Sequence, residues 1–102
     1  MGRTAKAMQF LLIAYDGTDA EAPARRQRAR VAHLENVRRM KAEGSFIEGG
    51  AILNDAGEMI GSMLLLEFPG MAELNDWLKS DPYTVGKVWE SVEVKPFRRA
   101  PV

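Results

Sequence analysis

The alternation of apolar and polar positions divides the first half of the chain into a strand and a long helix. Met8–Tyr15 is a short apolar run with aromatic and branched side chains, and Asp16 with Gly17 follows it as a predicted turn. The segment Pro23–Glu43 is rich in Ala, Arg, Glu and Leu and is followed by Gly44, which predicts a long helix. Its apolar stripe is expected to face the core: Val31, Leu34, Val37 and Met40.

The second half of the chain predicts three strands and a short helix. Phe46–Leu53 and Glu58–Phe68 read as strands joined by a turn at 54–57. Met71–Leu78 has the spacing of a short amphipathic helix, 81–83 begins a turn with helical character, and Val88–Phe97 is the last strand. The order is βαββαβ. Two right-handed crossovers around a hairpin give an α+β, ferredoxin-like fold, with a four-stranded antiparallel sheet and both helices on one face.

The first and third predicted strands are apolar on both faces of the sheet. Met8–Ala14 and Met59–Leu66 contain few polar or small residues, whereas a half-exposed antiparallel strand alternates apolar with polar. The two predicted helices can cover only one face of the sheet, so the other face must be covered by a different protein surface. We expect a homodimer through this open sheet face, because symmetric dimers are the commonest oligomers. The alternative is an exposed apolar face that serves a different partner.

Composition excludes several classes of protein. The 102 residues fit one domain, which we expect to span 1–102 with a flexible end at 1–7. Equal numbers of acidic and basic residues argue against nucleic-acid binding. The absence of cysteine and the single histidine exclude a disulfide, a cysteine nucleophile and a multi-histidine metal site within one subunit, so we expect no cofactor. No apolar stretch could span a bilayer and no signal sequence is recognisable, which predicts a cytoplasmic protein without a membrane partner.

His33 is the first candidate for chemistry. It shares one side of the predicted long helix with Arg26, Arg30 and Val37, and that side borders the apolar stripe. This position places His33 near the junction of helix and sheet. The simpler interpretation is a partly buried neutral histidine bonded to a carbonyl. The functional interpretation is a general acid or base, because an imidazole changes charge near neutral pH.

Asp81 is the second candidate. It precedes a proline, which is the arrangement of a helix N-cap, and capping alone explains it. Its functional role would be to accept a hydrogen bond from His33 and so fix the tautomer of the imidazole.

Asp16, Arg30 and Ser62 are weaker candidates. Asp16 follows a strand, where an Asx-type turn is the simpler interpretation and a pocket carboxylate the functional one. Arg30 could attract an anionic substrate, although an arginine on a helix usually belongs to a solvated face. The pairs Gly49-Gly50 and Gly61-Ser62 could let a ligand approach the backbone, or could mark β-bulges.

Taken together, these residues resemble the YciI-like (YCII-related) family over Met8–Phe97. The resemblance rests on an ordered set of motifs: Tyr15-Asp16, Arg30-Val31-Ala32-His33-Leu34, Gly44, Gly49-Gly50-Ala51, Gly61-Ser62, Asp81-Pro82-Tyr83-Thr84-Val85-Gly86 and Val94-Lys95-Pro96-Phe97. It implies a ferredoxin-like subunit that pairs into a dimeric α/β barrel. It also implies an active site built on a histidine and an aspartate, which map onto His33 and Asp81.

The resemblance implies a cofactor-independent enzyme of isomerase, lyase or dehydrochlorinase type. His33 would move a proton on a small organic anion, aromatic or lactone-like, and Asp81 would orient the ring, with four substrate contacts: Arg30, Asp16, Ser62 and Tyr83. One alternative is a non-catalytic dimer that binds a small ligand or a protein, and another is a cofactor-independent oxygenase. A cavity that reaches both side chains of the pair would favour an enzyme, and tight packing without a cavity would favour the binding module.

Overall fold

Four strands and three helices follow one another in the computed structural model, which describes residues 7–102. The expected flexible end at 1–7 lies, apart from its last residue, outside the described residues. The elements, in chain order, are β1 (Met8–Asp16), α1 (Ala22–Glu43), β2 (Phe46–Leu53), β3 (Met59–Phe68), α2 (Met71–Ser80), α3 (Pro82–Val85) and β4 (Trp89–Phe97).

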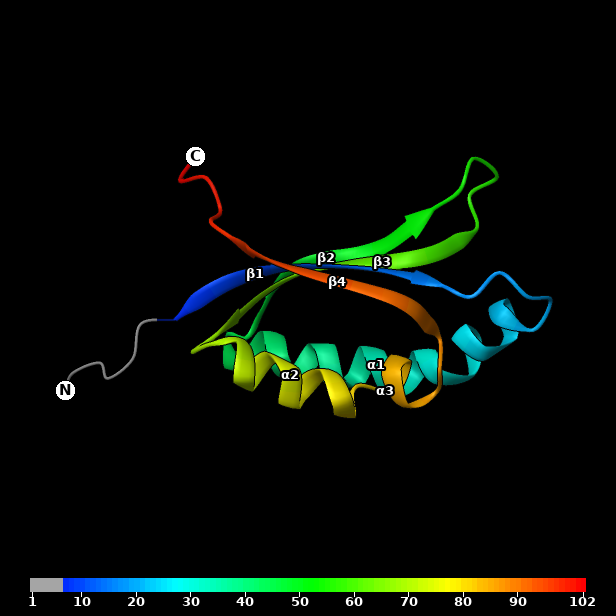
Figure 1. Ribbon diagram of the computed structural model, residues 1–102, viewed down its shortest axis with the longest axis horizontal. Helices are drawn as coiled ribbons and strands as arrows, with labels where there is room; N and C mark the ends of the chain where they lie inside the picture. The colour runs from blue at the N-terminus through cyan, green and yellow to red at the C-terminus, as the bar shows by residue number, and fades with distance from the viewer. Residues whose placement is uncertain (1–6) are drawn as a thin grey trace.

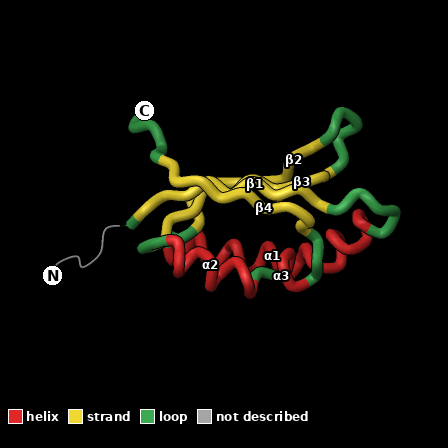
Figure 2. The backbone as a smooth tube through the Cα atoms, viewed as in Figure 1, coloured by secondary structure: helices red, strands yellow, loops and turns green. Residues whose placement is uncertain are grey.

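The strands form one antiparallel sheet in the order β2-β3-β1-β4. All three helices lie beneath the same face of this sheet, and the β2–β3 hairpin rises away from them (Figure 1). The tube view shows the two layers, strands above helices (Figure 2). The predicted α+β, ferredoxin-like fold is confirmed. The segment at 81–83, predicted as a turn with helical character, begins the single turn of helix α3.

The ends of α1 follow from its sequence. A proline lies in its first turn, where the missing N–H costs no hydrogen bond. At the other end Gly44 adopts a left-handed conformation with φ 92°; its backbone N–H donates to the carbonyl of Lys41, and the N–H of Ser45 donates to that of Met40. The predicted start and stop of the helix are therefore correct to within one residue.

The predicted apolar stripe of α1 is wrong at Val31. Val31 is 69% exposed, and the buried residues of α1 are Ala22, Arg26, His33 and Met40. Because each helical residue turns by about 100°, Val31 points roughly 200° away from His33. The side of α1 that faces the sheet thus carries two polar residues at its centre, and both find buried partners.

The two faces of β1 and β3 differ in what covers them. Phe10, Leu12 and Leu66 point toward the helices and are at most 1% exposed. The neighbouring residues Leu11 and Ile13 point to the opposite face, where they pair in register with Leu65 and Met63. No helix covers this second face within the described residues (Figure 1).

The strand glycines allow close backbone approach. A Cβ on Gly49 would lie 2.4 Å from the carbonyl oxygen of Met63, and one on Gly61 would lie 2.4 Å from that of Ala14. The register shifts between β2 and β3 lie between Phe46 and Glu48 and between Ile52 and Leu53. The interpretation as a bulge is therefore wrong for Gly49-Gly50, which pair regularly with β3, whereas the shift at Ile52/Leu53 lies opposite Gly61 and Met59 and so adjoins Gly61.

Candidate active site

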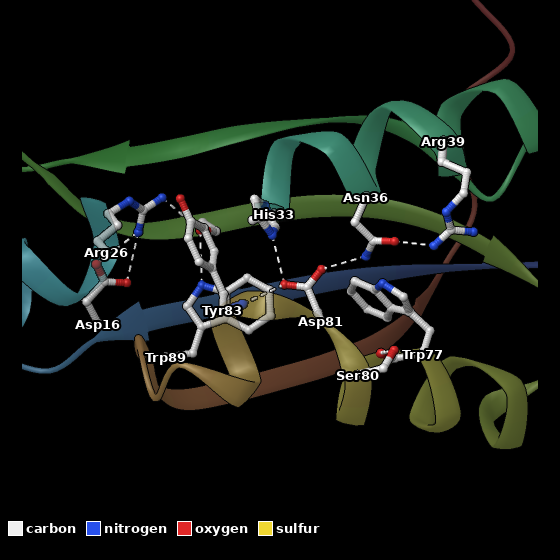
Figure 3. A network of polar contacts seen from close by, with 11 residues as sticks. Asp16, Arg26, His33, Asn36, Arg39, Trp77, Ser80, Asp81, Tyr83 and Trp89 are labelled. Carbon is white, nitrogen blue, oxygen red and sulfur yellow. Dashed lines mark hydrogen bonds and ion pairs between the residues drawn. The ribbon is translucent and has the colours of Figure 1, made fainter. Parts of the chain in front are cut away.

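His33 and Asp81 meet although they are 48 residues apart (Figure 3). His33 Nδ1 lies 2.8 Å from Asp81 Oδ2, and the two side chains are 7% and 0% exposed. An ionised carboxylate can only accept hydrogen bonds, so Nδ1 carries the proton that joins them. Asp81 Oδ2 also accepts the backbone N–H of Tyr83 at 3.0 Å, as the N-cap of α3. The capping interpretation and the bond to His33 therefore both hold.

A third donor reaches Asp81 from α1. Asn36 Nδ2 donates to Asp81 Oδ1 at 3.0 Å, and the guanidinium of Arg39 donates in turn to Asn36 Oδ1. Asn36 is not among the site residues predicted from the sequence. Its position three residues after His33, on the same side of the helix, is the signal that could have indicated it.

Aromatic rings hold the imidazole in place. The ring of Tyr83 stacks on that of His33, with centroids 3.8 Å apart and planes at 10°. Trp89 meets both rings edge-on, with centroids 5.5 Å from Tyr83 and 5.9 Å from His33. The guanidinium of Arg26 lies 4.8 Å from the Tyr83 ring centroid, and Tyr83 lies between Arg26 and His33 (Figure 3). The imidazole is therefore restricted both by stacking and by its bond to Asp81.

Asp16 forms a buried ion pair with Arg26. Both carboxylate oxygens of Asp16 lie 2.9 Å from Arg26 Nη1, and the side chains of Arg26 and Asp16 are 4% and 5% exposed. Arg26 Nη2 donates to Ser62 Oγ at 3.0 Å, and Trp89 Nε1 donates to the same oxygen at 3.1 Å. Asp16 is therefore not a turn residue but the buried end of β1. The position of Arg26 on the same side of α1 as His33 was predicted from the sequence, but its partner Asp16 was not.

A cavity of about 210 Å³ lies beside the histidine. Its polar lining comes from Arg26, Arg30, His33, Ser62 and Tyr83, and apolar side chains of α1, β2 and β3 complete it. Asp81 lies behind His33 and is not part of the wall. The cavity therefore reaches His33 directly, whereas Asp81 is connected to it only through the side chain of His33.

A second, larger cavity of about 760 Å³ lies between the start of α1 and the β2–β3 hairpin. It is lined by Asp16 among others and does not reach His33, but it shares Arg26 and Met59 with the smaller cavity. The pair His33–Asp81 therefore belongs to the smaller cavity.

Arg30 lines the smaller cavity and has a weak hydrogen-bond acceptor beside it. Its guanidinium donates to the sulfur of Met59 at 3.2 Å, and a thioether is a weak acceptor. Burial raises the pKa of Tyr83, although the positive charges of Arg26 and Arg30 oppose the rise. The phenol is therefore neutral at physiological pH and is able to donate a hydrogen bond.

The raised pKa of Tyr83 predicts a loss of stability at alkaline pH. Because the folded state binds this proton more tightly than the unfolded state, the stabilisation is complete below about pH 10 and is lost as the pH rises through the folded pKa. Urea unfolding measured at rising pH should show this loss in the parent, and Tyr83→Phe should reduce it. The exposed Tyr15→Phe is the control. Equal alkaline losses in the parent and Tyr83→Phe would contradict the assignment.

The fold and the site define a small ferredoxin-like α+β protein with a buried histidine–aspartate pair beside a cavity. Residues 8–98 match the sequence model of the YCII-related domain, and the chain belongs to this YciI-like family. The protein YciI of Escherichia coli O6:H1 is 30% identical over 96 residues, which cover 88% of this chain and 98% of the relative. An uncharacterized protein of Haemophilus influenzae is 30% identical over 82 residues, covering 74% and 83%.

A solved structure with the same fold is the 5-chloro-2-hydroxyhydroquinone dehydrochlorinase of Burkholderia phenoliruptrix AC1100, in complex with 2,5-dihydroxybenzoquinone. The TM-score is 0.78 at 24% identity, and the match covers 91% of this chain and 96% of the dehydrochlorinase. The family predicted from the sequence is confirmed, and this similarity supports the fold. In residues 7–102 no helix is both long and apolar enough to cross a membrane. Among the same residues, no three His, Cys, Asp or Glu side chains form a group that could hold a metal ion.

Proposed function

We propose that the protein is an enzyme that uses His33 for acid–base chemistry on a small monocyclic anion, without a cofactor. The observation that carries the proposal is the bond from His33 Nδ1 to the fully buried Asp81, beside a cavity that His33 lines. Because Asp81 holds the proton on Nδ1, the neutral ring offers Nε2 to a ligand as a base. The carboxylate then stabilises the imidazolium that forms when Nε2 takes a proton.

The size of the cavity limits the ligand. A cavity of about 150 Å³ can hold benzene, so the space of about 210 Å³ beside His33 fits one ring with a few substituents. Arg30 would receive a negatively charged or oxygen substituent of that ring, and Tyr83 and Ser62 lie in the same wall. Asp16 would act indirectly, by holding Arg26 in place.

The dehydrochlorinase of similar fold supports this class of ligand. Its name describes the removal of HCl from a substituted hydroquinone, and the molecule in its complex is a dihydroxybenzoquinone, also a single ring. Loss of HCl from such a ring requires a proton to leave one hydroxyl group and a proton to reach the carbon that carries chlorine. Chloride then departs as a second hydroxyl group gives up its proton, so that one proton and one chloride are lost in all. A single imidazole that alternates between base and acid can serve these proton transfers in turn.

The test is chloride release from 5-chloro-2-hydroxyhydroquinone by the purified protein, followed with a chloride electrode alongside an oxygen electrode. Chloride release above the uncatalysed rate, without oxygen uptake, would support acid–base chemistry on this class of ring. Oxygen uptake would favour the oxygenase. If neither this compound nor hydroquinones and lactones of similar size turn over, the enzymatic proposal is wrong.

A non-catalytic binding module is the second candidate. It is favoured by one observation: Asp81 is fully buried, caps α3 and is absent from the cavity wall, so the pair could serve structure alone. In that case 2,5-dihydroxybenzoquinone or a related anion would bind in the cavity without being converted. Calorimetric binding with no turnover would identify this function.

The open sheet face supports a further part of the proposal, that two copies of the chain pack sheet against sheet. Leu11, Ile13 and Met63 are half-buried and adjacent on this face. A dimer interface of ordinary size would bury them and remove apolar surface from water.

Ile13→Glu should dissociate this dimer. A carboxylate buried without a partner on both copies should raise the dissociation constant by at least about 100-fold. Light scattering after size exclusion measures the mass, and Val31→Glu, on the exposed side of α1, is the matched control. A parent that is monomeric at high concentration, or a dimer that survives in Ile13→Glu, would rule out this interface.

A further inference from the structure

We propose that Asn36 is a positioning residue, which holds the carboxylate of Asp81 in the orientation that keeps the proton of His33 on Nδ1. The catalytic importance of Asn36 rests on the proposed function, whereas the test of its positioning role does not require a substrate.

The two oxygens of Asp81 have different partners. Oδ2 accepts from His33 Nδ1 and from the backbone N–H of Tyr83, whereas Oδ1 accepts from Asn36 Nδ2 at 3.0 Å. Asp81 is fully buried, so no water reaches Oδ1 to replace a lost donor. Without Asn36 the carboxylate gains by turning Oδ1 toward one of its other donors, which weakens the alignment of Oδ2 with the imidazole.

The amide of Asn36 has one orientation that suits this role. Its nitrogen must face Asp81, because its oxygen would repel the carboxylate. Arg39 fixes this orientation by donating to Asn36 Oδ1. Arg39 in turn lies 3.3 Å from Glu43, an exposed pair at the end of α1. These successive contacts therefore connect the protein surface to the buried His33–Asp81 pair.

The spacing along α1 makes this arrangement possible. His33, Asn36 and Arg39 follow one another at intervals of three residues, so their side chains lie on neighbouring turns of one side of the helix. One rigid helix therefore presents both the imidazole and the amide to the same carboxylate (Figure 3).

The test reads the tautomer of His33 directly. The chain has one histidine, so ¹⁵N-labelled untagged protein gives one pair of ring nitrogen signals. At a pH where the ring is neutral, their shifts give the ratio of the Nδ1–H to the Nε2–H form. Asn36→Leu should lower this ratio about fivefold, the effect of losing one buried hydrogen bond. Arg39→Ala should lower it by a smaller factor of about two.

The matched control is Arg38→Ala, which removes the neighbouring exposed arginine and should leave the ratio at the parent value. A parent ratio in a folded Asn36→Leu variant would overturn the proposal, because His33 and the backbone N–H of Tyr83 would then suffice to hold Asp81. If Asn36→Leu does not fold, the tautomer ratio in Arg39→Ala is the test instead. This variant should stay folded, because Arg39 is an exposed residue. A parent ratio there would likewise overturn the proposal.

The failure of this inference can be told apart from the failure of the proposed function. A lowered ratio in Asn36→Leu, in a protein that turns over no substrate, upholds the positioning role and leaves the enzymatic role without support. Once a substrate is known, kcat should fall in Asn36→Leu by about the factor that the tautomer ratio loses. If both kcat and the tautomer ratio are unchanged in Asn36→Leu, the positioning role of Asn36 is rejected, and His33 remains the proposed catalytic residue.

Discussion

Replacing His33 with glutamine should lower kcat by about 10²–10⁴-fold on a ring substrate, while the protein stays folded. Glutamine retains a donor and an acceptor at a similar distance from the backbone, but it cannot take up and release a proton near neutral pH. The rates of chloride release by the parent and the variant give the ratio, and circular dichroism reports the fold.

Asp81→Asn should lower kcat by a comparable factor. An amide that donates to Nδ1 moves the proton of the neutral ring to Nε2, so Nε2 no longer acts as the base. The control is Glu35→Gln, an exposed change on α1 two residues from His33. Full activity in His33→Gln would show that the proton is moved by another group.

The second large effect concerns stability. Arg26→Met should lower the free energy of unfolding by about 3–5 kcal/mol, because it leaves the buried carboxylate of Asp16 without its partner. The variant also loses the donor to Ser62 and the cation over the Tyr83 ring. Equilibrium unfolding in urea measures the change.

Arg25→Met is the matched control, since this neighbouring arginine pairs with the exposed Asp19 and should matter little. The double variant Asp16→Leu with Arg26→Met should recover much of the loss, because replacing a buried pair with apolar side chains is often nearly neutral. Equal effects of Arg25→Met and Arg26→Met would show that the Asp16–Arg26 pair does not behave as a buried ion pair.

The fold could be predicted from the sequence because its signals are local. Gly44 ends α1, the turn at 54–57 joins β2 to β3, and the apolar runs give the strands. The side of α1 that faces the sheet could not be predicted in the same way. Hydrophobic periodicity indicated Val31, whereas the buried positions hold His33 and Arg26, whose burial depends on partners distant in the sequence.

The candidate site was predictable in part. Spacing alone favoured ordinary structural roles for His33 and Asp81, and the family resemblance brought them together. The geometry places them in contact. The spacing of Asn36 from His33 is a signal in the sequence, but neither the contact of Asn36 with Asp81 nor the pairing of Arg26 with Asp16 follows from spacing alone. Each depends on how α1 is rotated over the sheet, which the whole packing decides.

The most direct test of the central claim is to follow the ring nitrogens of His33 by NMR while 2,5-dihydroxybenzoquinone is added. We expect the Nε2 signal to move with saturation, while Nδ1 keeps the proton shared with Asp81. In Asp81→Asn the response of Nε2 should be lost or should require at least about tenfold more ligand. Ring nitrogens that do not respond at any ligand concentration, or that respond equally in Asp81→Asn, would contradict the account.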